Sequence, residues 1–85
     1  MNRIWQKINV KCNPDWQQYN CKLTNSCNLI IYSSGYGLMW VAILQFNDGR
    51  CREFLLKADS AENAKVEALK IVDEHVEEYQ YVTYD

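Results

Sequence analysis

The side chains of this chain that could do chemistry are four cysteines, at positions 12, 21, 27 and 51, and one histidine, His75. Thiolates and imidazoles can hold zinc, and a thiol beside a histidine can act as a nucleophile. The cysteines are separated by 8, 5 and 23 residues, so the closely spaced pair that is typical of structural zinc is absent. No motif supplies the orienting acid or oxyanion hole of a Cys–His site. We therefore expect no catalysis, no metal and no cofactor, and keep a small thiol or zinc protein as a second alternative.

The compartment of the chain bears on the state of its cysteines. No apolar run approaches the roughly 18 residues of a membrane helix, and the first twelve residues lack the continuous apolar stretch of a secretory signal. We expect a cytoplasmic protein without membrane contact, whose thiols stay reduced. Cys21 and Cys51 are then expected to be small buried hydrophobic residues, although the even count leaves disulfides open.

Phosphate binding by basic side chains is a second possible chemistry. Residues 1–52 carry six Lys and Arg against two Asp (+4), whereas residues 53–85 carry three Lys against nine Asp and Glu (−6). A nucleic-acid binder is usually basic overall, so protein is favoured over nucleic acid as the partner. The aromatic residues interleaved in the N-terminal half keep a single-strand binder as the first alternative. Its contacts would be Lys7, Lys11, Lys22, Arg50 and Arg52.

The elements that must position these residues follow from hydrophobic periodicity in what we expect to be a single domain, 1–85. Strands are predicted at 3–11, 19–24, 28–33, 38–46 and 50–57. In the first, expected to be an edge strand, Ile4 and Ile8 share one side and Trp5 lies on the polar side. The fold class is α+β: an antiparallel sheet of three to five strands packed by one long C-terminal helix.

Glycine turns predict two hairpins. The stretch SSGYG, residues 33–37, separates the third and fourth strands, and Asn47-Asp48-Gly49 separates the fourth and fifth. The second turn allows a two-residue type I′ loop or a three-residue loop with a bulge. The two-residue register places Val41 with Phe54 on one face and Trp40 with Leu55 on the other.

The C-terminal helix is predicted within residues 57–79. Asp59 or Ser60 can cap it, and Glu62 can complete a capping box with Asp59. Lys65 and Glu67 are expected to face outward. An apolar stripe would face the sheet, formed by Ala61, Ala64, Ala68, Leu69, Ile71, Val72, Val76 and Tyr79.

The fourth strand is apolar on both faces, and one helix covers only one of them. The other face must be covered by the N-terminal segment with Trp5 and Trp16, by another copy of the chain, or by a different protein. We therefore predict a homodimer or a hetero-interface through Trp40, Leu44 and Phe46, or through the opposite face if the register differs.

Acidic residues crowd the end of the helix, where the macrodipole is already negative, so they cost stability. The group consists of Asp73, Glu74, Glu77 and Glu78, followed by Tyr79 and Tyr81. Stability alone would favour lysine at these positions. We expect this acidic end to contact a partner protein with a basic surface.

Residues 38–78 resemble the β-β-α half of a double-stranded RNA-binding domain, with LMWVAILQF, NDGR, CREFLLK and ADSAENAKVEAL in that order. That family grips phosphates with a lysine cluster at the helix start, where this sequence matches only Lys65. Members without the cluster act as protein-interaction or dimerisation modules, and this is the function that the resemblance implies. The size, acidity and plan are also similar to small anti-CRISPR and other phage counter-defence proteins. We expect a non-enzymatic protein-binding module, a stoichiometric inhibitor or adaptor.

Overall fold

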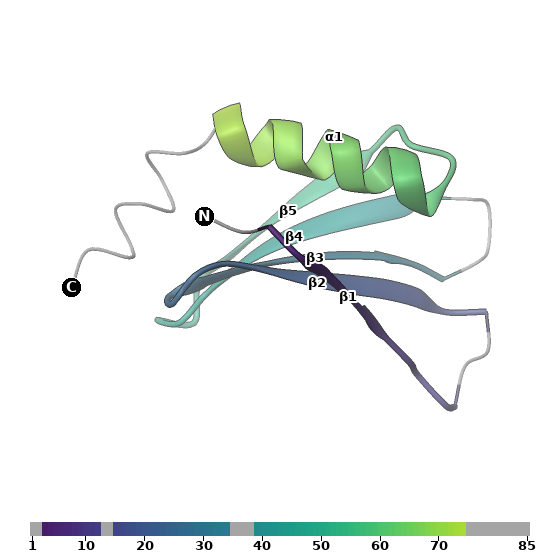
Figure 1. The fold of residues 1–85 in the computed structure, drawn as a ribbon, viewed down its shortest axis with the longest axis horizontal. Helices are drawn as coiled ribbons and strands as arrows, with labels where there is room; N and C mark the ends of the chain where they lie inside the picture. The colour runs from purple at the N-terminus through teal and green to yellow at the C-terminus, as the bar shows by residue number, and fades with distance from the viewer. Residues whose placement is uncertain (1–2, 13–14, 35–38, 75–85) are drawn as a thin grey trace.

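The computed structural model describes residues 3–12, 15–34 and 39–74, and within them five strands are followed by one helix (Figure 1). The strands are β1 (Trp5–Ile8), β2 (Gln17–Thr24), β3 (Cys27–Ser33), β4 (Trp40–Phe46) and β5 (Cys51–Leu56), and the helix is α1 (Ala61–Glu74). Each strand pairs antiparallel with the next one in the chain, in the spatial order β1-β2-β3-β4-β5. The predicted α+β plan is confirmed, and β1 is an edge strand as expected.

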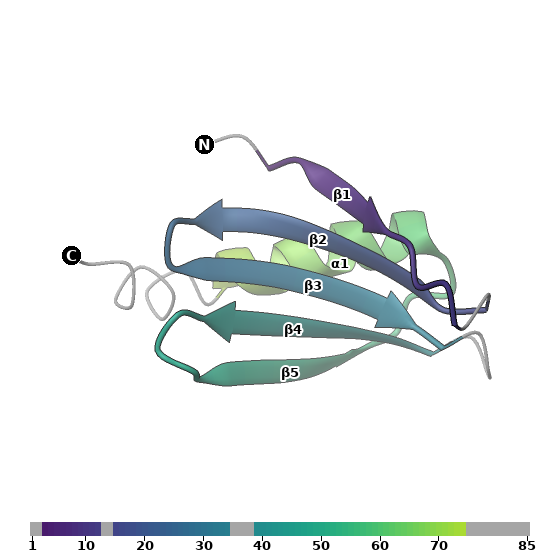
Figure 2. The same ribbon diagram turned by 90° about the horizontal axis from the view of Figure 1, so that it is seen from below.

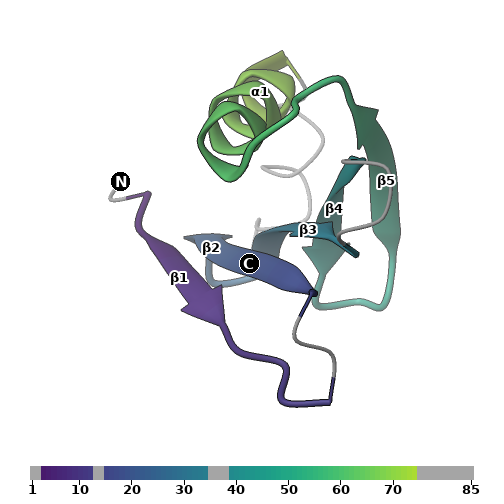
Figure 3. The ribbon, with the colours of Figure 1, turned by 90° about the vertical axis from the view of Figure 1, so that its right-hand side faces the viewer.

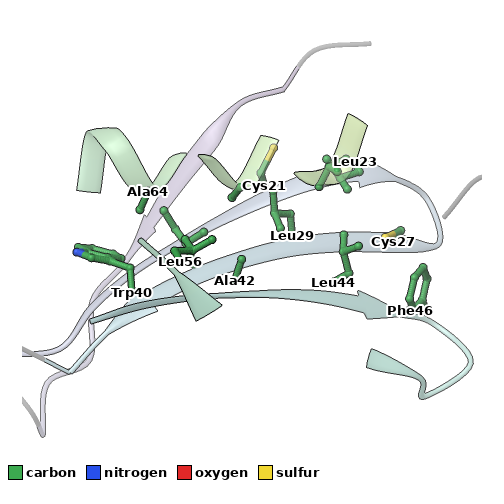
Figure 4. Packing of buried hydrophobic residues seen from close by; sticks show 13 residues of the cluster. Cys21, Leu23, Cys27, Leu29, Trp40, Ala42, Leu44, Phe46, Leu56 and Ala64 are labelled. Atoms are coloured by element: carbon green, nitrogen blue, oxygen red, sulfur yellow. The ribbon is translucent and has the colours of Figure 1, made fainter. Parts of the chain in front are cut away.

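α1 packs across one face of the sheet and leaves the other uncovered by any described element (Figure 2). The covered face holds the core, in which side chains from β2 to β5 point toward the helix (Figure 4). Ala64, Ala68 and Val72 on α1 are fully buried against it. The small alanines let the helix lie close to the sheet, so larger strand residues fill the space between the layers. The buried strand residues are Cys21, Leu23, Cys27, Leu29, Ile31, Trp40, Ala42, Leu44, Phe46 and Leu56.

The turn between β4 and β5 decides which side chains of β5 join the core. Phe46 and Arg50 close a three-residue loop, in which the backbone N–H of Phe46 donates to the carbonyl of Arg50 at 2.9 Å. Gly49 takes a φ of 95°, a positive value that glycine adopts more easily than other residues. Trp40 therefore pairs with Leu56, and Val41 pairs with Leu55. The predicted two-residue register is therefore wrong, and the three-residue alternative is correct. The difference matters because a shift by one residue exchanges the two faces of β5.

The two hairpin turns at one end of the sheet are tied together. Asn47 donates from its side chain to the carbonyl of Asn25 at 2.9 Å and from its backbone N–H to the carbonyl of Ser26 at 3.0 Å. A bulge between Lys22 and Thr24 precedes the β2–β3 turn. Turns that would otherwise be solvated loops thus fix each other, which stiffens this end of the sheet.

α1 begins with a cap at Ser60. The Ser60 hydroxyl accepts the backbone N–H of Asn63 at 3.2 Å, and the Ser60 carbonyl accepts the first helical N–H, from Ala64. The capping box between Asp59 and Glu62 is wrong, because Asp59 instead accepts the side-chain amide of Asn63. Of the predicted apolar stripe, Val76 and Tyr79 lie outside the described residues, as do most of SSGYG and the chain after Glu74.

β1 presents the opposite face to the core from the one predicted. Trp5 pairs with Cys21, packs against the core cluster and is half-buried, whereas Ile4 is 70% exposed. A large aromatic ring at the sheet edge covers more apolar core than an isoleucine, so it outweighs the alternation of Ile4 and Ile8. Trp5 therefore covers the helix side of the sheet and contributes nothing to covering the other face.

Candidate protein-binding surface

The face of the sheet away from α1, hereafter the open face, alternates along each strand with the core side chains. The register places Tyr32, Val41 and Leu55 in one row across β3, β4 and β5, and Ile30, Ile43 and Glu53 in the next. Leu55 is 66% exposed, and neighbouring Met39 is 54% exposed. Ile30, Val41 and Ile43 are half-buried although no described strand or helix lies over them. An apolar strip thus runs across three strands at the molecular surface.

Two aromatic rings stack on the open face. Trp16, just before β2, lies over Tyr32 of β3 with ring centroids 4.8 Å apart and planes 11° from parallel. The indole N–H of Trp16 donates to the Gln18 side-chain carbonyl at 3.0 Å, and the Gln18 amide donates to Asn20 at 3.1 Å. The predicted cover by the N-terminal segment is therefore partial, and it comes from Trp16 at the β2 side of the strip.

A depression of about 600 Å³ adjoins this amide row, where β1, β2 and β3 meet. It is lined by Ile4, Trp5, Gln6, Asn20, Lys22 and Asn28. All of these side chains except Ile4 can donate hydrogen bonds, the three amides can also accept them, and Lys22 carries a positive charge. This part of the surface suits an acceptor group rather than an apolar one.

The five basic residues of the nucleic-acid alternative do not share a face. Lys7 pairs with Tyr19 and Arg52 with Leu44, so both lie on the helix side, at opposite edges of the sheet. Lys22 pairs with Asn28 on the open face. Arg50, in the β4–β5 turn, binds Asp48 at 2.7 Å and lies over the Phe46 ring. Exposed Lys11 follows β1. A phosphate chain that follows one groove cannot meet all five.

The acidic end of α1 is described only as far as Glu74, and Glu77, Glu78, Tyr79 and Tyr81 lie outside the described residues. Asp73 does not stand as a free acid: its carboxylate binds the Arg3 guanidinium at 2.8 Å, across 70 residues of sequence. This partner is not local in the sequence, and only the folded chain brings Arg3 to Asp73. Glu74 is exposed and makes no ion pair with any described residue.

The three apolar residues proposed as contacts from the sequence are core residues. Trp40 is 3%, Leu44 0% and Phe46 3% exposed, and all three belong to the buried core on the helix side of the sheet (Figure 4). A partner cannot reach them in this structure. The interface is therefore expected on the opposite face, which is the prediction made for the case that the register differs. The residues that sequence reasoning left out are Ile30, Tyr32, Val41, Ile43 and Leu55. The three-residue turn would have placed Leu55 on the same face as Val41 and Ile43.

The four cysteines are free thiols that fall into two classes. Cys21 and Cys27 are buried, whereas Cys12 and Cys51 are exposed. Cys51 was expected to be buried, and it is exposed because its position in β5 belongs to the open face beside Gln45. Burial raises the pKa of the Cys21 thiol, with a smaller opposing effect of Arg3. Within the described ranges, no three His, Cys, Asp or Glu side chains gather as metal ligands would.

Two outward-facing helix positions carry structural contacts. The Lys65 ammonium lies 4.3 Å from the centroid of the Tyr19 ring, so it folds over β2 and is not simply solvated. Glu67 is turned toward the chain between β5 and α1. Over the residues that the structure describes, no helix has the length and apolar character needed to cross a membrane.

Comparison of the chain with models of protein families, with curated proteins and with solved structures finds no match.

Proposed function

We propose that this chain is a small non-enzymatic protein-binding module, acting as a stoichiometric inhibitor or adaptor. The observation that supports it is the open face: an apolar strip of Ile30, Tyr32, Val41, Ile43 and Leu55 with no layer over it among the described elements. Soluble proteins tend to reserve contiguous exposed apolar surface for binding. Apolar surface with few charges is also the composition found at the centres of protein interfaces.

The acidic end of α1 supplies the second contact surface in this proposal. Glu74 is exposed and, with Glu77 and Glu78 beyond it, gives this end a local negative charge. The partner would present basic side chains there, which speeds encounter and fixes orientation more than it adds affinity. Asp73 is left out of this surface because it binds Arg3.

A single-strand nucleic-acid binder is the second candidate, favoured by one observation. The Trp16–Tyr32 stack lies on the open face of a sheet, where a base could stack on the outer face of the indole. The dispersal of the five cations argues against it. Titration of labelled single strands at low salt tests it, and a dissociation constant no tighter than about 10⁻⁴ M would exclude it.

Protein binding is tested by capture and reconstitution. The wild-type chain is the bait in a lysate of its native host, beside Ile43→Lys on the open face and Val66→Lys on α1. Val66 is 70% exposed and lies on the helix, so the second variant makes the same chemical change away from the open face. Captured proteins are then purified and their affinity for each variant is measured.

The proposal expects a saturable complex that Val66→Lys retains. Loss with Ile43→Lys would assign the contact to the open face, and loss with the combined Glu74→Lys, Glu77→Lys and Glu78→Lys variant would assign it to the acidic end. If no captured protein binds saturably, or if all variants bind alike, the proposed function is overturned.

A further inference from the structure

Charge is distributed on the open face in a pattern that a second copy would complement. Among the described strand residues of this face, only Lys22 on β2 and Glu53 on β5 are charged. Both are exposed, and neither makes an ion pair with another described residue. The apolar rows of β3 and β4 lie between them. The face is therefore apolar in the middle, positive on one side and negative on the other.

The amide row on β2 has a fixed direction. An indole N–H can only donate, so the Gln18 atom that faces Trp16 must be the carbonyl oxygen. The Gln18 amide group then points the other way and donates to the Asn20 oxygen. Asn20 lines the depression together with Lys22 and can still donate through its own amide group. This end of the row thus offers the Asn20 amide and the Lys22 ammonium as hydrogen-bond donors.

The strand register gives a position for the complementary acceptor. Asn20 pairs with Ile30, Ile30 with Ile43, and Ile43 with Glu53, so these four residues form one row across the sheet. A twofold axis along the boundary between β3 and β4 would place β2 of one copy opposite β5 of the other. Asn20 then faces Glu53 of the second copy, with Lys22 one row away.

We infer that the open face binds a second copy of this chain, sheet against sheet, with each Glu53 carboxylate received by Asn20 and Lys22 of the other copy. This inference deepens the proposed function. It rests on one part of that proposal, namely that the open face contacts protein. The apolar residues Ile30, Tyr32, Val41 and Ile43 of the two copies form the centre of the interface. One self-complementary patch on both subunits is the requirement of a twofold interface.

The curvature of the sheet agrees with this division of roles. The sheet bends around α1, so the open face is its outer side (Figure 3). Two such faces meet most closely along their middle strands, where the apolar residues lie, and diverge toward β2 and β5. Long side chains are needed to bridge the wider gap, and Lys22 and Glu53 occupy those positions. A second copy supplies Glu53 as the acceptor and Asn20 and Lys22 as the donors. It also supplies the apolar residues of the centre, because all of these residues lie on the same face.

The inference is tested by light scattering on the purified full chain, from low micromolar to submillimolar concentration. The same measurement is made on variants in which the two charges are exchanged. We expect the mass of two chains for the wild type. Lys22→Glu and Glu53→Lys should each raise the dissociation constant of the dimer by about tenfold or more, because each creates two like-charge contacts. An equimolar mixture of the two variants should restore the dimer, since both contacts are then attractive. A variant that failed to fold would not be restored.

Lys70→Glu and Glu62→Lys are the matched controls, because they make the same exchanges at exposed positions of α1. Both should leave the dimer unchanged. A wild-type chain that stays monomeric, or single variants that dimerise like the wild type, would overturn the inference. A monomer that still binds a captured protein would overturn the dimer alone. A charge-dependent dimer that binds no other protein would support the inference and overturn the inhibitor or adaptor role.

Discussion

Glu67, in the middle of α1, receives the backbone N–H of Lys57 on both carboxylate oxygens, at 3.0 Å each. One of these oxygens also accepts the N–H of Ala58 at 2.9 Å. These two N–H groups follow the last residue of β5, where no further strand can accept them. A helix side chain thus replaces a sheet partner and holds the chain between β5 and α1 in place.

Replacing Glu67 with alanine should lower the free energy of unfolding by about 1 to 3 kcal/mol, because the backbone N–H groups of exposed Lys57 and half-buried Ala58 lose a charged acceptor. Glu67→Gln should lower it less, since one oxygen remains. Glu62→Ala, whose side chain is 86% exposed, is the control and should change it by less than about 0.5 kcal/mol. Urea denaturation monitored by circular dichroism measures all three. Equal effects at the two positions would contradict the assigned role of Glu67.

Asp73 and Glu74 are adjacent acids, yet their replacement should affect stability in opposite directions. Glu74→Lys should raise the free energy of unfolding by about 0.3 to 1 kcal/mol, because a cation suits the helix C-terminus. Asp73→Asn should lower it by up to about 1 kcal/mol, because the ion pair with Arg3 on an exposed surface is lost. Arg3→Gln should also lower it, and the double variant should show a non-additive effect. Additive changes would show that the ion pair contributes nothing.

Protonation of Asp48, in the β4–β5 turn, should make the stability of the fold depend on pH. The backbone N–H of Arg50 donates to its carboxylate at 3.0 Å and, with the Arg50 side chain, lowers the pKa of Asp48. A carboxyl group whose pKa is lower in the folded state stabilises the fold above its unfolded pKa, about 3.9, and this stability is lost as pH falls through the folded pKa. Asp48→Asn should therefore flatten the decline in melting temperature below about pH 4. An identical pH profile for the variant would exclude this contribution.

The cysteines should react with a thiol reagent in two phases. Cys12 and Cys51 are exposed and should be modified rapidly in the native state. Cys21 and Cys27 are buried, and the raised pKa of Cys21 further disfavours its reactive thiolate. Two thiols should therefore react at once and two only after addition of denaturant, with Cys12→Ser and Cys51→Ser each removing one fast thiol. Four fast thiols in the native state would contradict the burial of Cys21 and Cys27.

Local patterns predicted most of the fold, because strand alternation and the helix stripe are short-range properties. The sequence predicted the five strands, the edge position of β1 and the C-terminal helix. The site was harder, since the face of β5 depends on whether Asn-Asp-Gly forms a two-residue or a three-residue loop. Both loops suit those residues locally, and the packing of Leu56 and Trp40 against α1 selects between them.

Long-range contacts were not predictable from the chain alone. Arg3 and Asp73 are far apart in sequence, and no motif links them. The same holds for Asn47 and Asn25, whose bond depends on the two turns arriving at one end of the sheet. Trp5 was assigned to the wrong face because its size, rather than the alternation around it, decides the packing of a short edge strand.

The order of the strands bears on how quickly the chain finds its fold. Because every strand pairs with its immediate neighbour in sequence, each pairing closes only a short loop and costs little chain entropy. The hairpins can form one after another without waiting for distant segments to meet. Among the strands that the structure describes, β1 pairs only with β2, so it can add last. Hydrogen-exchange labelling during refolding should therefore show protection of β3 and β4 before β1.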